Sequence, residues 1–215
     1  MRNVKTWGLA LLAALSVAAA MAVPASADTL NAQGYPAVLT GEADVETGSF
    51  VTTAGIVSCP WPKYDATISS SVSTAGSVSV TPTYPDEGCT GFGFPATVET
   101  NGCTFVFRGL FSGTTGGVDL ECPFGKEVTI TARSAGVLKC TIHVPTQTFI
   151  GSASFTNIAG GITAMVSASL IDYTHTQGTG LGSCPSGSGS IGSLSARAII
   201  KAESESGVST SLWLT

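Results

Sequence analysis

Apolar and polar residues alternate along much of the chain after residue 28. Alternation with a period of two is typical of a β-strand that buries one face. No window beyond the first 27 residues carries a long apolar pattern with the 3.6-residue period of a helix. The pattern therefore predicts an all-β protein of antiparallel sheets with a β-sandwich-like architecture. The predicted strands are residues 36–45, 50–59, 66–72, 77–84, 104–110, 118–122, 127–132, 137–144 and 195–201.

One hairpin is predicted from its turn. Residues 96–100 and 103–107 both have strand character, and Asn101-Gly102 separates them. This dipeptide accepts the positive φ angles of a type I′ turn, which joins neighbouring antiparallel strands. We therefore expect the two segments to pair with each other.

The first 27 residues have the pattern of an export signal. Arg2 and Lys5 give a cationic start, an apolar run covers 7–23, and Ala-Ser-Ala ends the segment. This order predicts a cleavable signal peptide over 1–27 and a secreted mature domain over 28–215. A membrane anchor is the alternative, because a run of this length lies near the lower limit for crossing a bilayer. No second long apolar run follows, so no transmembrane segment is expected in the mature chain.

The composition narrows the class of protein. Only 11% of the residues are charged, whereas 26 serines and 28 threonines supply hydroxyl groups and 43% of the residues are hydrophobic. Such a chain has too few Lys, Glu, Gln and Arg residues for solvated helices and too much apolar character for disorder. Residues 1–27 hold two of the nine cations and none of the 14 acids, so the mature net charge is 7 − 14 = −7. Nucleic acids are not expected partners, because phosphate binding needs clustered cations.

All six cysteines lie in the mature domain. An even count in an exported chain predicts three disulfides, whereas zinc sites usually contain closely spaced cysteine pairs such as C-x-x-C, which are absent here. The cysteines are Cys59, Cys89, Cys103, Cys122, Cys140 and Cys184.

An internal resemblance suggests a diverged duplication. Residues 54–59 and 135–140 both read Ala-Gly, two aliphatic residues, one polar residue and Cys. Each motif is followed by a strand-like segment that ends in a tyrosine and then by a turn-rich loop with a cysteine. Two related half-units, 35–102 and 126–215, would then be joined by a hairpin over 103–122. Chance similarity in a chain of low complexity is the alternative.

The duplication also suggests which cysteines pair. Each half-unit would tie a strand to its following loop, and the remaining two cysteines stand at the ends of the joining hairpin, where a cross-strand bridge is in reach. The expected disulfides are Cys59 with Cys89, Cys103 with Cys122, and Cys140 with Cys184.

Three acids at alternate positions, Glu42, Asp44 and Glu46, are a candidate calcium site. Carboxylates two residues apart on a strand point to the same side, and calcium prefers oxygen ligands. The further ligands of an EF-hand loop are missing. The alternative is a solvated row of charges that protects an exposed sheet edge from pairing with other chains.

Aromatic residues near the prolines suggest a binding platform. Trp61 stands between two prolines that favour an extended backbone near the surface, and Tyr64, Phe92 and Phe94 could add to an apolar platform for a sugar or a peptide. The alternative is a place in the core, where aromatic side chains are common.

Catalytic motifs are weak. The mature chain has two histidines, His143 on the polar face of a strand and His175, and a hydrolase would best combine His175 with Asp172 and Ser183. The segment 187–192 matches G-x-G-x-x-G, but no helix is predicted after it, so it is expected to be a flexible loop. No cofactor is predicted.

Short motifs at 100–105, 122–126 and 139–145 resemble a group of exported, β-rich, cysteine-bridged proteins of actinobacterial type whose function is unassigned. The resemblance implies a shared extracytoplasmic fold and carries over no catalytic residue.

These observations favour a secreted or cell-envelope-associated, non-catalytic β-protein that acts as a structural or binding module. A cell-wall glycan or another surface protein would be its partner. The alternatives are a secreted hydrolase that uses scattered carboxylates and a small-molecule carrier, which would need a cavity between its sheets.

Overall fold

The computed structural model describes residues 29–44, 47–73, 76–109, 116–179, 184 and 187–215. These residues form β-strands and no helix, which confirms the predicted all-β class, and none of them belongs to a helix able to cross a membrane. The strands are β1 (Leu30–Ala32), β2 (Ala37–Ala43), β3 (Thr47–Thr52), β4 (Gly55–Pro60), β5 (Lys63–Ile68), β6 (Ser77–Thr83), β7 (Thr90–Gly91), β8 (Phe94–Glu99), β9 (Thr104–Arg108), β10 (Gly116–Glu121), β11 (Val128–Ser134), β12 (Val137–Val144), β13 (Gln147–Ile158), β14 (Gly161–Gln177), β15 (Gly187–Ser204), β16 (Ser209–Thr210) and β17 (Leu212–Leu214).

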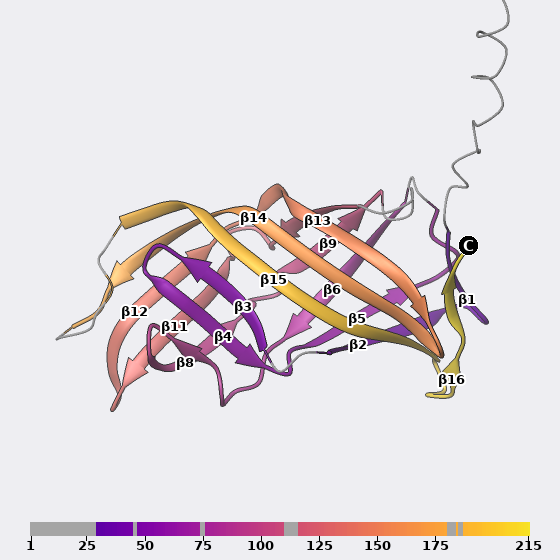
Figure 1. The fold of residues 1–215 in the computed structure, drawn as a ribbon, viewed down its shortest axis with the longest axis horizontal. Coiled ribbons are helices and arrows are strands. Elements are labelled where there is room, and N and C mark those ends of the chain that lie inside the picture. The colour runs from indigo at the N-terminus through magenta and orange to yellow at the C-terminus, as the bar shows by residue number, and fades with distance from the viewer. Residues whose placement is uncertain (1–28, 45–46, 74–75, 110–115, 180–183, 185–186) are drawn as a thin grey trace, which may run out of the picture.

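The main antiparallel sheet closes on itself twice. Ring A runs through β2, β5, β6, β9, β10, β13, β14 and β15, and the pairing of β15 with β2 closes it. Ring B runs through β3, β4, β7, β8, β11, β12, β14 and β15, and the pairing of β15 with β3 closes it. The long strands β14 and β15 belong to both rings and extend along the molecule (Figure 1). The two rings therefore lie end to end and share one wall.

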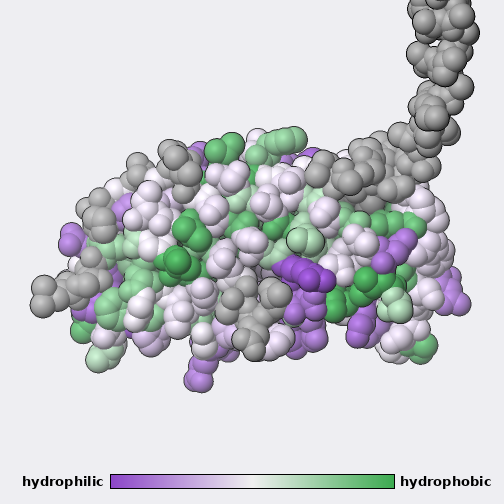
Figure 2. Space-filling view, in the orientation of Figure 1, coloured by the Kyte–Doolittle hydropathy of each residue, from purple (hydrophilic) through white to green (hydrophobic). Residues whose placement is uncertain are grey.

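Period-two alternation sets which side chains face inward. On β14, Ile171, Tyr173 and His175 are buried, whereas Asp172 and Thr174 between them are exposed. The outer faces are rich in Ser and Thr, and Figure 2 accordingly shows a surface whose hydropathy is mostly intermediate. The hydroxyl-rich composition thus belongs to the outside of the rings.

A two-stranded sheet of β1 and β17 packs at one end of ring A. Leu30 and Leu212 of this sheet are buried in the core. The side chain of Asn157 on β13 fastens it, because its Nδ2 donates to the Leu214 carbonyl oxygen at 2.9 Å and its Oδ1 accepts from the Leu214 amide at 2.8 Å. Strands near both ends of the chain therefore meet here (Figure 1).

Two strand predictions are wrong in their pairing. The predicted strand 50–59 is a hairpin, in which β3 and β4 pair across a turn at Thr53 and Ala54. The turn at Asn101 and Gly102 has the expected positive φ angles of 52° and 82°. Its flanking strands do not pair, because β8 pairs with β7 and β11 in ring B, and β9 pairs with β6 and β10 in ring A. This turn therefore leads the chain from one ring to the other.

The glycine-rich segment 187–192 is a strand, which corrects the expectation of a loop. It forms the start of β15 and pairs with β14. A Cβ atom on Gly189 would overlap the ring of Tyr173, and one on Gly192 would lie 2.7 Å from the ring of Phe50. The glycines are thus needed because aromatic rings occupy the space that side chains would fill.

The structure confirms the three expected disulfides and the hairpin between β9 and β10. Both Ala-Gly motifs of the suggested duplication stand at a hairpin turn before β4 or β12. Their neighbours differ, because β4 also pairs with β7 and β12 also pairs with β14. The division into two half-units stays a prediction.

Candidate functional site

A row of three adjoining cavities lies inside the rings. The first cavity, of about 80 Å³, is bordered by both rings, and two further cavities of about 50 and 40 Å³ follow it along ring A. Tyr64 borders all three, so we treat them as one row. The 80 Å³ cavity is lined by Gly48, Phe50, Val57, Cys59, Pro62, Tyr64, Pro82, Tyr84, Val98, Thr100, Phe105, Leu120, Val128, Ile130, Val144, Ile150, Ile171, Leu194 and Ala196.

Small residues on the inner faces leave this space open. A closed ring of eight strands has an interior that is just filled by its own side chains or that holds one small ligand. Ala164, Ala196 and Ala198 stand at inward positions of the shared strands β14 and β15, where larger side chains would fill the interior. Voids larger than a water molecule are few in close-packed cores. The cavity row is therefore a candidate ligand site.

Two tyrosines carry the polar groups of greatest interest in the cavity row. Tyr64 lies on β5 and Tyr84 directly follows β6, and both border the two larger cavities. Burial raises the pKa of the Tyr64 phenol to about 12. Burial, and secondly the nearby Tyr64, raise the pKa of the Tyr84 phenol still further. Both phenols are therefore neutral at ordinary pH and available as hydrogen-bond donors.

Neither of these hydroxyl groups has a hydrogen-bond partner among the described residues. Both side chains are half-buried, and both border the two larger cavities. A bound molecule with an acceptor oxygen would give each phenol the hydrogen bond that the described residues do not supply.

The predicted aromatic platform does not form as one surface. Trp61 is 57% exposed, whereas Tyr64 faces the cavity row inside the rings. Phe92 and Phe94 are partly buried against the core, and Phe94 lies 5.8 Å from the ammonium group of Lys139. Of the four residues named from the sequence, Tyr64 alone borders the cavities that we describe.

The predicted calcium site is not assembled in the described residues. Glu46 lies outside them, Glu42 is exposed, and the carboxylate of Asp44 pairs with Arg197 at 2.9 Å. No three metal-ligating side chains of His, Cys, Asp or Glu come together within the described ranges. The edge-protection alternative does not fit Glu42, because β2 lies between β15 and β5 and is not an edge.

The suggested hydrolase residues do not converge. Asp172 and His175 lie on opposite faces of β14, because an odd number of positions separates them along a strand. Ser183 lies outside the described residues. His175 is instead buried beside Tyr173, and the ring centroids are 5.8 Å apart.

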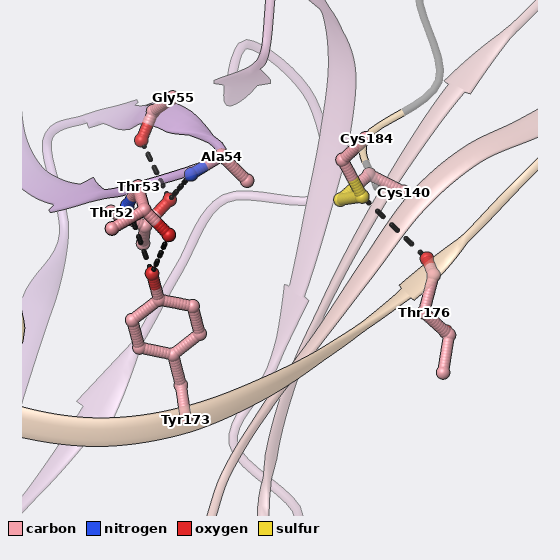
Figure 3. Close-up of a disulfide and its surroundings, with 8 residues drawn as sticks. All are labelled: Thr52, Thr53, Ala54, Gly55, Cys140, Tyr173, Thr176 and Cys184. Atoms are coloured by element: carbon pink, nitrogen blue, oxygen red, sulfur yellow. Dashed lines mark hydrogen bonds between the residues drawn. A yellow bond between two sulfur atoms is a disulfide. The ribbon is translucent and has the colours of Figure 1, made fainter. Parts of the chain in front are cut away.

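Tyr173 has a structural role that the sequence did not reveal. Its side chain is 2% exposed and packs edge-on against Phe50. Its hydroxyl oxygen accepts from the Thr53 amide at 2.8 Å and lies 2.7 Å from the Thr53 hydroxyl (Figure 3). The disulfide of Cys140 and Cys184, drawn in the same view, ties β12 to the chain after β14 (Figure 3).

Outside the cavity row, charged side chains form surface pairs. Nδ1 of His143 lies 2.6 Å from Glu127 on the outer face of ring B, as expected for the polar face of β12. A pair that is this exposed contributes little to stability.

One carboxylate outside the cavity row is buried. Asp119 is 4% exposed, accepts from the Phe149 amide at 2.7 Å and pairs with Arg108. Burial opposes the ionisation of Asp119, but the bond from Phe149 and the contacts with Arg108 outweigh it and lower the pKa. This carboxylate therefore holds β9, β10 and β13 together rather than serving the cavity.

No motif in the sequence marks Tyr84 as a site residue, although it ends the predicted strand 77–84. No period-two signal distinguishes a side chain that faces a cavity from one that fills the core.

Comparisons with family models, curated proteins and solved structures give no match to this chain.

Proposed function

We propose that the protein is a non-catalytic binding protein that carries a small, mostly apolar molecule in the cavity row. The observation that carries this proposal is a row of apolar cavities bordered by two tyrosines whose hydroxyls have no partner among the described residues. Atoms around a void lose dispersion contacts, which costs stability. A bound apolar molecule would restore these contacts.

The cavity lining also argues for binding rather than catalysis. Within the described residues that line the three cavities there is no Asp, Glu, His, Lys or Arg. General acid–base catalysis most often uses one of these residue types, and the two tyrosines of the lining keep their protons at ordinary pH because burial raises their pKa. This absence favours a carrier over the alternative of a hydrolase with scattered carboxylates.

The place of action that we propose is outside the cytoplasm. Three disulfides and the signal-like segment 1–27 support export, because disulfides persist in oxidising compartments. A cell-wall glycan or another surface protein could receive the carrier through its outer strand faces. Retention on cell walls that survives washing would support that partner.

Thermal unfolding with toluene tests the proposal. A ligand that binds only the folded state stabilises it by about 1.4 kcal/mol when its concentration is ten times Kd. We expect toluene to raise Tm in a concentration-dependent way, and to shift the NMR signals of residues that line the cavities. No rise in Tm and no shift at saturation would overturn the proposal.

A variant that fills the cavity row provides the control. Ala196 borders the two larger cavities, so Ala196→Phe should abolish the response to toluene. Its neighbour Ser195 is exposed on the other face of β15, so Ser195→Phe should respond like the wild type. An equal response of both variants would show that toluene binds elsewhere.

A further inference from the structure

The geometry points to a more specific ligand class, an uncharged molecule with one carbonyl oxygen that Tyr64 and Tyr84 bind together. This inference rests on the proposed function. Both residues border the same two cavities, and Tyr64 lies opposite Pro82 in the register of β5 and β6, so Tyr84, two residues after Pro82, is its diagonal neighbour on the same face. The two donors therefore serve one region of the cavity row.

The first step is the direction of the hydrogen bonds. Both phenols keep their protons well beyond neutral pH, since burial raises the pKa of each. A protonated phenol without a partner offers its O–H as a donor. A carbonyl oxygen has two lone pairs, so a single oxygen can accept from both tyrosines.

The second step excludes charge. The described lining holds no cationic side chain that could pair with an anion and no carboxylate that could pair with a cation. Burying an isolated charge costs far more than two neutral hydrogen bonds return. Carboxylates and amines should therefore bind poorly, although they share the hydrocarbon part of a good ligand.

The third step is the support of Tyr64. Gly41 on β2 lies opposite Tyr64 in the register, and a Cβ atom on Gly41 would lie 3.2 Å from the Cβ of Tyr64. Pro82 on β6 lies opposite Tyr64 on the other side. The backbone of Tyr64 is thus fixed between two ladder neighbours, and Gly41 leaves room beside the Tyr64 side chain.

Two ligands of matched shape test the inference. Cyclohexanone and methylenecyclohexane differ only in an oxygen atom against a CH₂ group. Two hydrogen bonds predict that cyclohexanone binds about tenfold more tightly, measured as Kd by ligand-detected NMR. The ¹³C signal of the bound carbonyl should also shift in the direction of stronger hydrogen bonding.

Phenylalanine variants assign the effect to the two hydroxyls. Tyr64→Phe and Tyr84→Phe should each lower the ratio of the two Kd values, and the double variant should bring the ratio to about one. Tyr35→Phe is the control, because the Tyr35 hydroxyl accepts from the Ala32 amide and does not border the cavities described here. Circular dichroism checks that each variant is folded.

The outcomes separate the two proposals. Equal binding of both ligands to the wild type would overturn the carbonyl selection and leave the carrier function standing. Binding of neither ligand, together with no response to toluene, would overturn both. A ratio that persists in the double variant would assign the selection to other residues and also overturn this inference.

Discussion

The hydroxyl of Tyr173 lies 2.8 Å from the amide nitrogen of Thr53, a residue 120 positions away in the chain. It thereby joins β14, a strand of both rings, to the turn between β3 and β4. The same hydroxyl lies 2.7 Å from Oγ1 of Thr53. The Tyr173 side chain thus provides an acceptor for the partly buried amide of Thr53, which would otherwise have none.

Tyr173→Phe should therefore destabilise the protein. The variant keeps the ring but removes the acceptor of the Thr53 amide, which should lower the free energy of unfolding by about 1–3 kcal/mol. Urea unfolding of both proteins measures the change. Tyr64→Phe is the matched control, because its hydroxyl has no partner among the described residues, and it should lie within about 0.5 kcal/mol of the wild type or above it. Equal losses in both variants would contradict the assigned role.

Gly189→Ala tests why β15 begins with glycines. The added methyl group would overlap the buried ring of Tyr173, which its bonds to Thr53 hold in place. Overpacking of this kind should lower the free energy of unfolding by about 1–3 kcal/mol. Gly34→Ala is the control, because Gly34 has open space around it. If Gly189→Ala were as stable as Gly34→Ala, the segment would not pack as a strand.

Tyr173 and Gly189 also show which features of this fold can be predicted from the sequence. Alternation in β12 predicted both its ends and its buried face, because that pattern is local. The composition around Gly189 predicts a loop. It cannot predict the strand, because the aromatic ring that requires a glycine here belongs to another strand. The turn predicted at Asn101 and Gly102 is confirmed, but the predicted pairing of the flanking strands is wrong, because turn geometry is local and strand pairing is not.

The candidate site was harder to predict for the same reason. Tyr64 was noted as an aromatic residue near the surface, and its inward orientation follows from the closure of ring A. Tyr84 carries no motif. A cavity is a property of side-chain volumes summed over many strands, so a period-two pattern cannot show where the interior is left unfilled.

The disulfides should contribute substantially to stability. Each bridge is expected to add about 2–4 kcal/mol, mainly by restricting the unfolded chain. A reductant should therefore lower Tm, and replacing Cys140 and Cys184 by alanine should cost more than replacing Cys103 and Cys122, because the sequence separations are 44 and 19 residues. Thermal unfolding of the two paired variants measures this order. An unchanged Tm under reducing conditions would mean that the bridges do not support the fold.

The lowered pKa of Asp119 predicts that the protein loses stability in acid. Its pKa in the folded state is lowered, so it stabilises the fold above the unfolded pKa of about 3.9, and this contribution disappears as the pH falls towards the folded value. Asp119→Asn should flatten the dependence of unfolding free energy on pH below about 4. Glu205→Gln changes an exposed acid and should retain the wild-type slope. A wild-type slope in Asp119→Asn would assign the acid sensitivity to other carboxyls.

The raised pKa values of Tyr64 and Tyr84 predict that the protein loses stability in alkali. The pKa of Tyr64 is raised from about 10 to about 12, and that of Tyr84 is raised as well, so the folded state holds these protons more tightly than the unfolded state. Their contribution is complete below pH 10 and is lost as the pH rises from 10 towards 12. Urea unfolding at several pH values in this range should show the decline.

The double variant Tyr64→Phe and Tyr84→Phe isolates this effect, because phenylalanine cannot ionise. Its stability should fall less steeply above pH 10 than that of the wild type, and phenolate absorbance should show the loss of two late-titrating groups. Tyr35→Phe should keep the wild-type slope, since that hydroxyl lies outside the cavity row. If the double variant declined as steeply as the wild type, the phenols would already be accessible to solvent. An interior open to bulk water could not favour an apolar guest, so this result would also count against the carrier function.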